Sequence, residues 1–280
     1  MRTRVKFCGL VRPDDVDAAV ALGVDAVGFV FWPGSPRRVD PVAAAALRRR
    51  LGSWVRAVGL FVNAPAAEII AVAGQVGLDT IQLHGDETIE AAARLAGLAQ
   101  SAGLTQLRWW KALRIGAPAA PAAAPQAAAP QAAVPQAAVP QAAVPQATAN
   151  PQAAVNQQFQ RGAVAADPVE LLQALALFTG AEHCLLDSAS AGYGGSGHRF
   201  DWSLVPPAAA ARLIVSGGLA ADNVGQAIAA IGPFAVDTSS GIQGPTPRQK
   251  DVSRMERFMA AVQEADRRRA ARDDPMIPTR

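Results

Sequence analysis

The chain has 280 residues, of which 50% are hydrophobic and 18% are charged, and its 26 basic and 23 acidic residues give a formal net charge of +3. This composition is typical of a globular protein that is long enough to bury a sizeable core. Two cysteines exclude a disulfide-stapled scaffold, and no apolar run reaches the roughly 18 residues of a membrane span. The start, MRTRVKFCGL, lacks the long apolar region of a signal peptide, so we expect a cytoplasmic protein with no membrane partner.

Strand-like and helix-like runs alternate along the first part of the chain. Short apolar runs predict strands at residues 5–8, 25–31, 55–62, 79–83 and 107–113. The segments between these runs predict helices at residues 14–22, 41–51, 66–76 and 87–100. This alternation is typical of a parallel sheet whose strands are joined by helices.

Residues 116–160, after the fifth predicted strand, differ sharply from the rest. They consist mainly of Ala, Pro, Gln and Val without any charged residue, and the unit PQAAV occurs three times between residues 130 and 144. Proline at every fifth position removes backbone donors and prevents a continuous helix. We expect a disordered or polyproline-II insertion, with a docking segment for a partner as the alternative interpretation.

The alternation resumes after this insertion. Strands are predicted at residues 183–186, 212–215 and 234–236, and helices at residues 168–178, 222–230 and 250–269, with a short helix near 202–206. The last helix ends in a basic cluster that comprises Arg267, Arg268, Arg269 and Arg272. Such a cluster could touch phosphates, but cations at the favourable pole of a solvated helix explain it more simply. We therefore expect no nucleic-acid partner.

Eight strand–helix units in a barrel-sized remainder predict the α/β class and a single closed (β/α)8 barrel rather than an open doubly wound sheet. No G-x-G-x-x-G motif follows the first strand, which also disfavours a dinucleotide-binding fold. We expect residues 1–265 to form this barrel, interrupted by residues 116–160. Residues 266–280 are expected to form a flexible C-terminal tail.

The active site of such a barrel lies where its strands end. This rule selects Cys8, the loop 32–38, Asn63, His84, Lys111, Asp187, Gly217, Gly218, Ser239, Ser240 and Gly241. The last five belong to two small-residue loops after the seventh and eighth strands. Glycines let backbone N–H groups approach an anion closely, and these two loops often bind phosphate in barrels. We therefore expect a phosphate site there, although the glycines could merely turn the chain.

Three side chains are candidates for acid–base chemistry. Cys8 ends the first strand and could act as a base if N–H groups or a cation help it to ionise, although a free cysteine is by default a small buried hydrophobe. Cys184 lies inside the sixth strand, where that default interpretation is favoured. Asp187 ends the same strand after three apolar residues and is a candidate acid. His84 is either a substrate contact or a hydrogen-bonded structural residue.

Eight stretches of the chain resemble phosphoribosylanthranilate isomerase of tryptophan biosynthesis. They are KFCGL (6–10), DAVGFVFWPGSPRRV (25–39), VGLFVN (58–63), IQLHGDE (81–87), LLDS (185–188), YGGSGHRFDW (193–202), SGGLAADNV (216–224) and AVDTSSGIQ (235–243). Together they cover nearly the whole chain apart from residues 116–161 and the end of the chain.

The resemblance implies a (β/α)8 barrel without metal or organic cofactor that acts on a phosphorylated small molecule, as a monomer or homodimer. The family converts N-(5-phosphoribosyl)anthranilate to 1-(2-carboxyphenylamino)-1-deoxyribulose 5-phosphate by an Amadori rearrangement. Its general base matches Cys8 and its general acid matches Asp187. Its arginine for the anthranilate carboxylate matches Arg37, whose guanidinium suits a carboxylate. Thr238 departs from the pattern, because the family often has valine there.

Three other functions remain to be weighed. A lyase barrel of the indole-3-glycerol phosphate synthase type needs a catalytic Lys/Glu set, and Lys111 is the only lysine at a strand end. The dual-substrate isomerase linked to histidine biosynthesis uses two aspartates, which Cys8 argues against. A non-catalytic binding barrel or a scaffold that presents the PQAAV segment is disfavoured by the presence of both Cys8 and Asp187.

We predict that the insertion is dispensable for catalysis. It has neither charge nor a large apolar face, so ordering it would cost backbone entropy with little burial in return. Replacing residues 116–160 with a short Gly/Ser turn should leave turnover and melting temperature nearly unchanged. A large loss of turnover in a variant that still melts cooperatively would contradict this prediction.

Overall fold

The computed structural model describes residues 2–115, 164–165, 167–188 and 200–273 of the chain. All of its strand pairs are parallel, and the strands are β1 (Arg4–Cys8), β2 (Ala26–Val30), β3 (Arg56–Phe61), β4 (Thr80–Leu83), β5 (Arg108–Ile115), β6 (Val164–Ala165), β7 (His183–Ser188), β8 (Leu213–Val215) and β9 (Ala235–Thr238). The predicted insertion, 116–160, lies outside the described residues.

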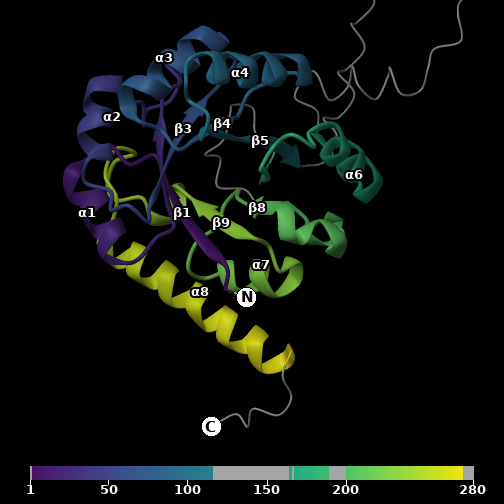
Figure 1. The fold of residues 1–280 in the computed structure, drawn as a ribbon. Helices are drawn as coiled ribbons and strands as arrows, with labels where there is room; N and C mark the ends of the chain where they lie inside the picture. The colour runs from purple at the N-terminus through teal and green to yellow at the C-terminus, as the bar shows by residue number, and fades with distance from the viewer. Residues whose placement is uncertain (1, 116–163, 166, 189–199, 274–280) are drawn as a thin grey trace, which may run out of the picture.

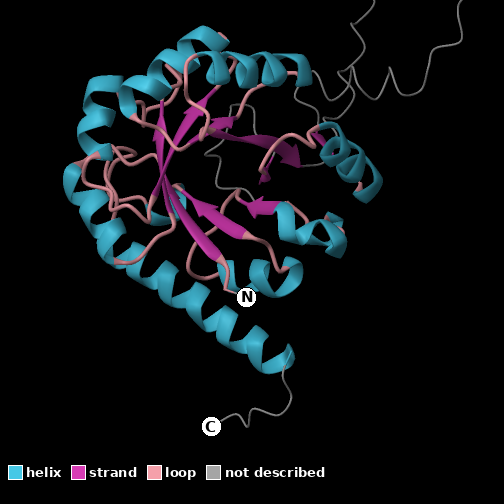
Figure 2. Ribbon diagram, viewed as in Figure 1, coloured by secondary structure: helices cyan, strands magenta, loops and turns pink. Residues whose placement is uncertain are grey.

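Eight of these strands close into a barrel. The order β4-β3-β2-β1-β9-β8-β7-β5 is completed by pairing of β4 with β5, while β6 extends the sheet from β5 outside this ring. Figure 2 shows the strands enclosed by helices, as expected for a (β/α)8 barrel. The predicted fold class is therefore confirmed, and the unpredicted element β6 has only two residues. No helix among the described residues is long and apolar enough to cross a membrane.

The helices form a layer around the barrel (Figure 1). They are α1 (Pro13–Ala21), α2 (Pro41–Arg48), α3 (Ala66–Val76), α4 (Ile89–Ser101), α6 (Pro168–Leu177), α7 (Val224–Ile231) and α8 (Val252–Asp273). Side chains of Asp40, Thr88 and Asp167 accept hydrogen bonds from the first turns of α2, α4 and α6. The short helix expected near 202–206 is replaced by two 3-10 turns, η1 (Trp202–Leu204) and η2 (Pro207–Arg212). Pro206, between these turns, and Pro207, the first residue of η2, lack the N–H groups that a continuous helix needs.

Apolar side chains form an outer and an inner core. The outer core lies between strands and helices and includes Val5, Phe7 and Phe258. The inner core lies within the barrel and comprises Ala26, Val58, Trp110, Ala112, Leu185, Ile214 and Ala235. Because successive side chains of a strand point to opposite faces, strands such as β2, β3 and β7 contribute to both cores. The polar part of the barrel interior lies next to this inner core, toward the carboxyl ends of the strands.

A buried ion pair joins two loops at the carboxyl end of the barrel. Lys111 on β5 donates to Glu87 Oε2 at 2.8 Å and to the Gly85 carbonyl at 2.7 Å. Glu87 also accepts from the backbone N–H groups of Asn63 and Gly85. Asn63 itself adopts a left-handed φ of 52°, which asparagine tolerates better than most residues. This cluster fixes the loops after β3 and β4 to each other.

The last helix is attached to the start of the chain. Asp266 on α8 accepts from the Thr3 backbone N–H and from the Thr3 hydroxyl, both at 2.7 Å. The Lys250 backbone N–H, just before α8, donates to Asp15 on α1 at 3.2 Å. Helix α8 extends to Asp273, so the expected tail boundary at residue 265 falls inside a helix. The helix thus ends four residues beyond the predicted end at residue 269.

An aromatic and charged stack closes the amino end of the barrel. The His183 ring stacks on Phe234 with a centroid distance of 3.8 Å, and the Arg4 guanidinium lies 4.3 Å from the Phe234 ring centre. Glu182 accepts from Trp110 Nε1 at 3.0 Å and pairs with Arg56. Burial lowers the pKa of His183, and this effect exceeds the opposing influence of Glu182.

We predict that His183 makes the fold less stable in mild acid. Its folded-state pKa is lowered, so the unfolded chain takes up the proton first as the pH falls below about 6.5. Its contribution is therefore intact above that pH and is lost as the pH falls. The free energy of unfolding, measured with urea at pH 7.5 and pH 5.5, should decrease less in His183→Phe than in the unmodified protein. An equal decrease in both would contradict the prediction.

Candidate active site

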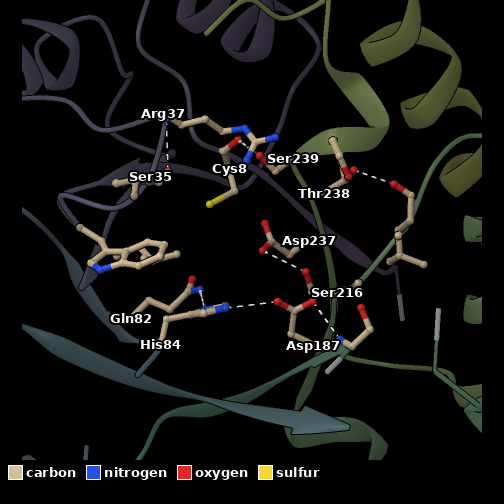
Figure 3. Close-up of a pocket in the computed structure, with 18 of the residues that line it drawn as sticks. Cys8, Ser35, Arg37, Gln82, His84, Asp187, Ser216, Asp237, Thr238 and Ser239 are labelled. Carbon is tan, nitrogen blue, oxygen red and sulfur yellow. Dashed lines mark hydrogen bonds and ion pairs between the residues drawn. The ribbon is translucent and has the colours of Figure 1, made fainter. Parts of the chain in front are cut away.

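A cavity of about 290 Å³ opens where the barrel strands end. Of the residues predicted from the sequence, it is lined by Cys8, Arg37, His84, Asp187, Gly217, Gly218, Ser239 and Ser240. Figure 3 shows that the side chains of Cys8, Asp237, His84 and Asp187 point into one space. The ninth predicted residue, Gly241, lies behind this lining, where a Cβ atom would collide with the Leu219 carbonyl.

Cys8 ends β1 and is 5% exposed. Its partner in the β1–β2 register is Gly28, and a Cβ atom at Gly28 would come within 2.7 Å of Cys8 Sγ. Burial raises the pKa of the Cys8 thiol above its ordinary value, while the neighbouring Lys6 ammonium opposes this shift. The cation that a thiolate base needs is thus present, although burial has the larger effect.

Two charged residues beside Cys8 were not among the predicted site residues. Asp237 lines the cavity from β9, and its Oδ1 accepts from Lys6 Nζ at 2.9 Å. Lys6 is the only charged side chain of β1 that lies between apolar neighbours, and Asp237 follows two apolar residues. For both residues, a single charge in an otherwise apolar strand was the sequence signal that could have revealed a site residue.

Asp187 ends β7 and is held by two hydrogen bonds. Its Oδ1 accepts from the Ser188 backbone N–H at 2.9 Å, and its Oδ2 lies 3.2 Å from His84 Nε2. The other ring nitrogen of His84 lies 2.8 Å from the amide nitrogen of Gln82. With that amide as donor, His84 Nδ1 accepts, so the ring proton is on Nε2 and points to Asp187. Gln82 was also missed, because a single polar residue in a strand does not reveal which face it occupies.

The loops after β8 and β9 form an anion-binding surface. Gly217 and Gly218 have φ values of 83° and 62°, which β-carbon-bearing residues rarely adopt. Among the described residues, no hydrogen bond takes up the backbone N–H groups of Gly217, Gly218 or Ser240. These groups are available to an anion such as phosphate.

Side chains hold these two loops in place. Asn223, the cap of α7, donates to the Gly218 carbonyl at 2.9 Å and accepts from the Ala220 N–H. Helix α7 begins at Val224, two residues later than the predicted start. The hydroxyl of Thr238 donates to the Leu219 carbonyl at 2.7 Å. Valine could not make this contact, so the departure noted at this position links the two loops.

Arg37 approaches the cavity from the loop after β2. Its Nη2 donates to Gln243 Oε1 at 2.7 Å, and its side chain packs on Gly9, where a Cβ atom would lie 2.6 Å from Arg37 Cδ. No described residue accepts a hydrogen bond from its buried Nε. Gln243 is a neutral acceptor, so it orients the guanidinium without cancelling its charge. The guanidinium of Arg37, which lines the cavity, can bind a carboxylate.

Lys250 contacts the loop after β9 through Ser239. Its Nζ donates to the Ser239 carbonyl at 2.9 Å and to the Ser239 hydroxyl at 3.2 Å. That hydroxyl in turn donates to the Cys8 carbonyl at 2.9 Å. Burial lowers the pKa of Lys250 to about 8.

Three other residues considered above lie outside the cavity lining. Lys111 and Asn63 belong to the loop cluster with Glu87, so no Lys/Glu set faces the cavity among the described residues. Cys184 is fully buried within β7, and burial raises the pKa of its thiol to about 11. An inert thiol is what the sequence predicted at this position.

The cavity therefore combines a thiol, a carboxyl with an imidazole, a cation and an anion-binding surface. A thiol and a carboxyl on strands that face each other can remove and supply protons on two sides of a bound molecule. The anion-binding loops and Arg37 can hold that molecule by two negatively charged groups.

Comparison with known proteins gives a consistent result. The family model described as N-(5'-phosphoribosyl)anthranilate (PRA) isomerase matches residues 5–106 and 147–261. The chain is 41% identical over 274 residues to N-(5'-phosphoribosyl)anthranilate isomerase of Ralstonia nicotianae, covering 95% of this chain and 94% of that protein.

Solved structures agree with this result. The crystal structure of phosphoribosyl anthranilate isomerase from Thermotoga maritima superposes with a TM-score of 0.66 and 29% identity, covering 94% of this chain and 99% of that one. A phosphoribosyl anthranilate isomerase in complex with reduced 1-(o-carboxyphenylamino)-1-deoxyribulose 5-phosphate gives a TM-score of 0.63 and 27% identity, with the same coverage.

Proposed function

The chain belongs to the N-(5'-phosphoribosyl)anthranilate isomerase family, and on that premise we propose that Cys8 and Asp187 are the general base and general acid of its reaction. It is an isomerase of tryptophan biosynthesis that converts N-(5'-phosphoribosyl)anthranilate to 1-(2-carboxyphenylamino)-1-deoxyribulose 5-phosphate. One observation supports the two roles above all: both side chains reach the same cavity from strands β1 and β7.

The proposed sequence of proton transfers uses these two groups in turn. Asp187 protonates the furanose ring oxygen, the ring opens, and a Schiff base forms at C1. The Cys8 thiolate then removes the proton on C2 and becomes a thiol, and the resulting enolamine becomes the ketone. The substrate supplies its own electron sink in the Schiff base, so this route calls for no cofactor. His84, at 3.2 Å from Asp187, orients the carboxyl toward the substrate.

The two charged groups of the substrate have separate partners in the cavity. The phosphate accepts from the backbone N–H groups of Gly217, Gly218 and Ser240 in the anion-binding loops. The anthranilate carboxylate pairs with the guanidinium of Arg37, which lines the cavity. This orientation places the sugar carbons between Cys8 and Asp187, where the proton transfers occur.

The wider properties follow from the same family membership. Solved relatives include monomers generated from the dimeric enzyme of Thermotoga maritima. We expect a monomer or a homodimer in the cytoplasm, acting on a phosphorylated small molecule without a nucleic-acid or membrane partner. The barrel and the C-terminal helix form one domain in this proposal, and residues 116–160 interrupt it.

We predict that Asp187→Asn loses turnover but keeps binding. The amide can still accept from the Ser188 N–H, but it cannot supply a proton to the ring oxygen. Turnover should fall by roughly 10²- to 10⁴-fold. The affinity for the reduced product analogue, measured by calorimetry, should change little. Asp17→Asn, on the solvated face of α1, is the matched control and should remain fully active. Near-normal turnover of Asp187→Asn would remove Asp187 from the acid role.

Cys8→Ser tests the base. The hydroxyl keeps the shape of the side chain but scarcely ionises near neutral pH, so turnover should fall by at least about a hundredfold. Alkylation should inactivate the unmodified enzyme, and the reduced product analogue should protect it. Cys184→Ser makes the same chemical change in β7 and should leave turnover intact. If Cys8→Ser retained most of its activity, the base would have to be another group, with His84 next to be tested.

A further inference from the structure

Lys6 is a buried cation that no step of the proposed reaction uses. It lies in the middle of β1 and is 2% exposed, and its Nζ is 2.9 Å from Asp237 Oδ1. The side chain of Asp237 is 6% exposed, so both charges of the ion pair are almost fully buried. Branched apolar side chains usually fill the interior of such a barrel, and burying two charges carries a large desolvation penalty. The pair therefore calls for a functional explanation.

The fold places this pair directly under Cys8. Lys6 and Cys8 are two residues apart on one strand, so both side chains point into the barrel. Lys6 is aligned with Asp237 in the β1–β9 register. On the other side, Gly28 leaves the space in which the two side chains meet. A Cβ atom at Gly28 would lie 2.7 Å from Cys8 Sγ and 3.2 Å from Lys6 Cε.

We propose that Lys6 is a positioning residue for the isomerase reaction, because its ammonium, fixed by Asp237, stabilises the thiolate form of Cys8. This inference rests on the proposed role of Cys8 as the base. Lys6 keeps all its protons throughout: the thiolate takes the C2 proton and becomes a thiol, and no proton passes to Lys6. The ion pair thus supplies charge at a fixed place without taking part in the transfer.

The charges around Cys8 support this role. Four charged groups face it: Lys6 on the same strand, Asp237 on β9, Arg37 after β2 and Lys250 before α8. Burial raises the pKa of the Cys8 thiol, and Lys6 is the strongest influence in the opposite direction, ahead of the contrary effect of Asp237. Burial alone would lower the pKa of Lys6, but the nearby Asp237 and Cys8 outweigh it, so this pKa is raised. Asp237 therefore favours the charged form of Lys6 beside Cys8.

Alkylation of Cys8 measures this effect without substrate. In a Cys184→Ser background, the rate of Cys8 modification by iodoacetamide is followed by mass spectrometry between pH 6 and pH 10. Lys6→Met should move the midpoint to higher pH and slow the reaction at pH 7 by about tenfold or more, since each pKa unit changes the thiolate fraction tenfold. Asp237→Asn should move the midpoint to lower pH. Turnover of Lys6→Met should fall with its thiolate fraction, with little change in affinity for the reduced product analogue.

The matched control is Lys111→Met, which removes another buried lysine from an ion pair away from the cavity. It should leave the Cys8 midpoint where it is. If Lys6→Met does not fold, the double variant Lys6→Met/Asp237→Asn leaves no unpaired charge and should still titrate above the unmodified protein. Lys6 and Asp237 variants that shift the midpoint in the same direction, or not at all, would overturn the proposal. An active Cys8→Ser would instead overturn the assignment of Cys8 as the base. The alkylation experiment would still report whether Lys6 stabilises the Cys8 thiolate, because it is done without substrate.

Discussion

The ion pair between Lys6 and Asp237 sits at the level of the barrel that divides its interior in two. Below it, alanine, valine, leucine, isoleucine and tryptophan side chains pack as an apolar floor. Above it, Cys8, His84 and Asp187 lie around a cavity at the strand ends. Both charges are almost fully buried, so each needs the other to avoid the cost of an unpaired buried ion. The pair thus ties the geometry of the catalytic layer to the closure of β1 against β9.

Much of this arrangement could be read from the sequence because parallel order carries strong information. Once eight strands alternate with helices, the carboxyl ends of all strands must meet at one face. Cys8, His84 and Asp187 each terminate an apolar run, so their convergence followed from the strand boundaries alone. The two small-residue loops after β8 and β9 were recognisable for the same reason. The reaction itself required the family resemblance, since many barrels share such loops.

The polar residues inside strands were not predictable in this way. Lys6 and Lys111 both interrupt apolar strands, yet Lys6 faces the interior beside Asp237 and Lys111 lies with Glu87 under the loops. A shift of one residue in the register of either strand would turn its lysine to the opposite face of the sheet. The face that each lysine occupies is fixed only when the strands pair in the closed barrel. The end of α8 was misplaced for a different reason, because a solvated helix offers no apolar boundary, and its contact with Thr3 is remote in sequence.

That contact between α8 and Thr3 has a consequence for the order of assembly during synthesis. Strand β1 pairs with β2 on one side and with β9 on the other. During synthesis β2 follows soon after β1, whereas β9 is made more than 200 residues later. Lys250 donates to Ser239, whose hydroxyl donates to the Cys8 carbonyl, so the loop after β9 is joined to Cys8 by residues that are made long after it. A nascent chain therefore carries its cysteine from the outset but gains a complete site last. The candidate site is therefore complete only once synthesis has passed Lys250.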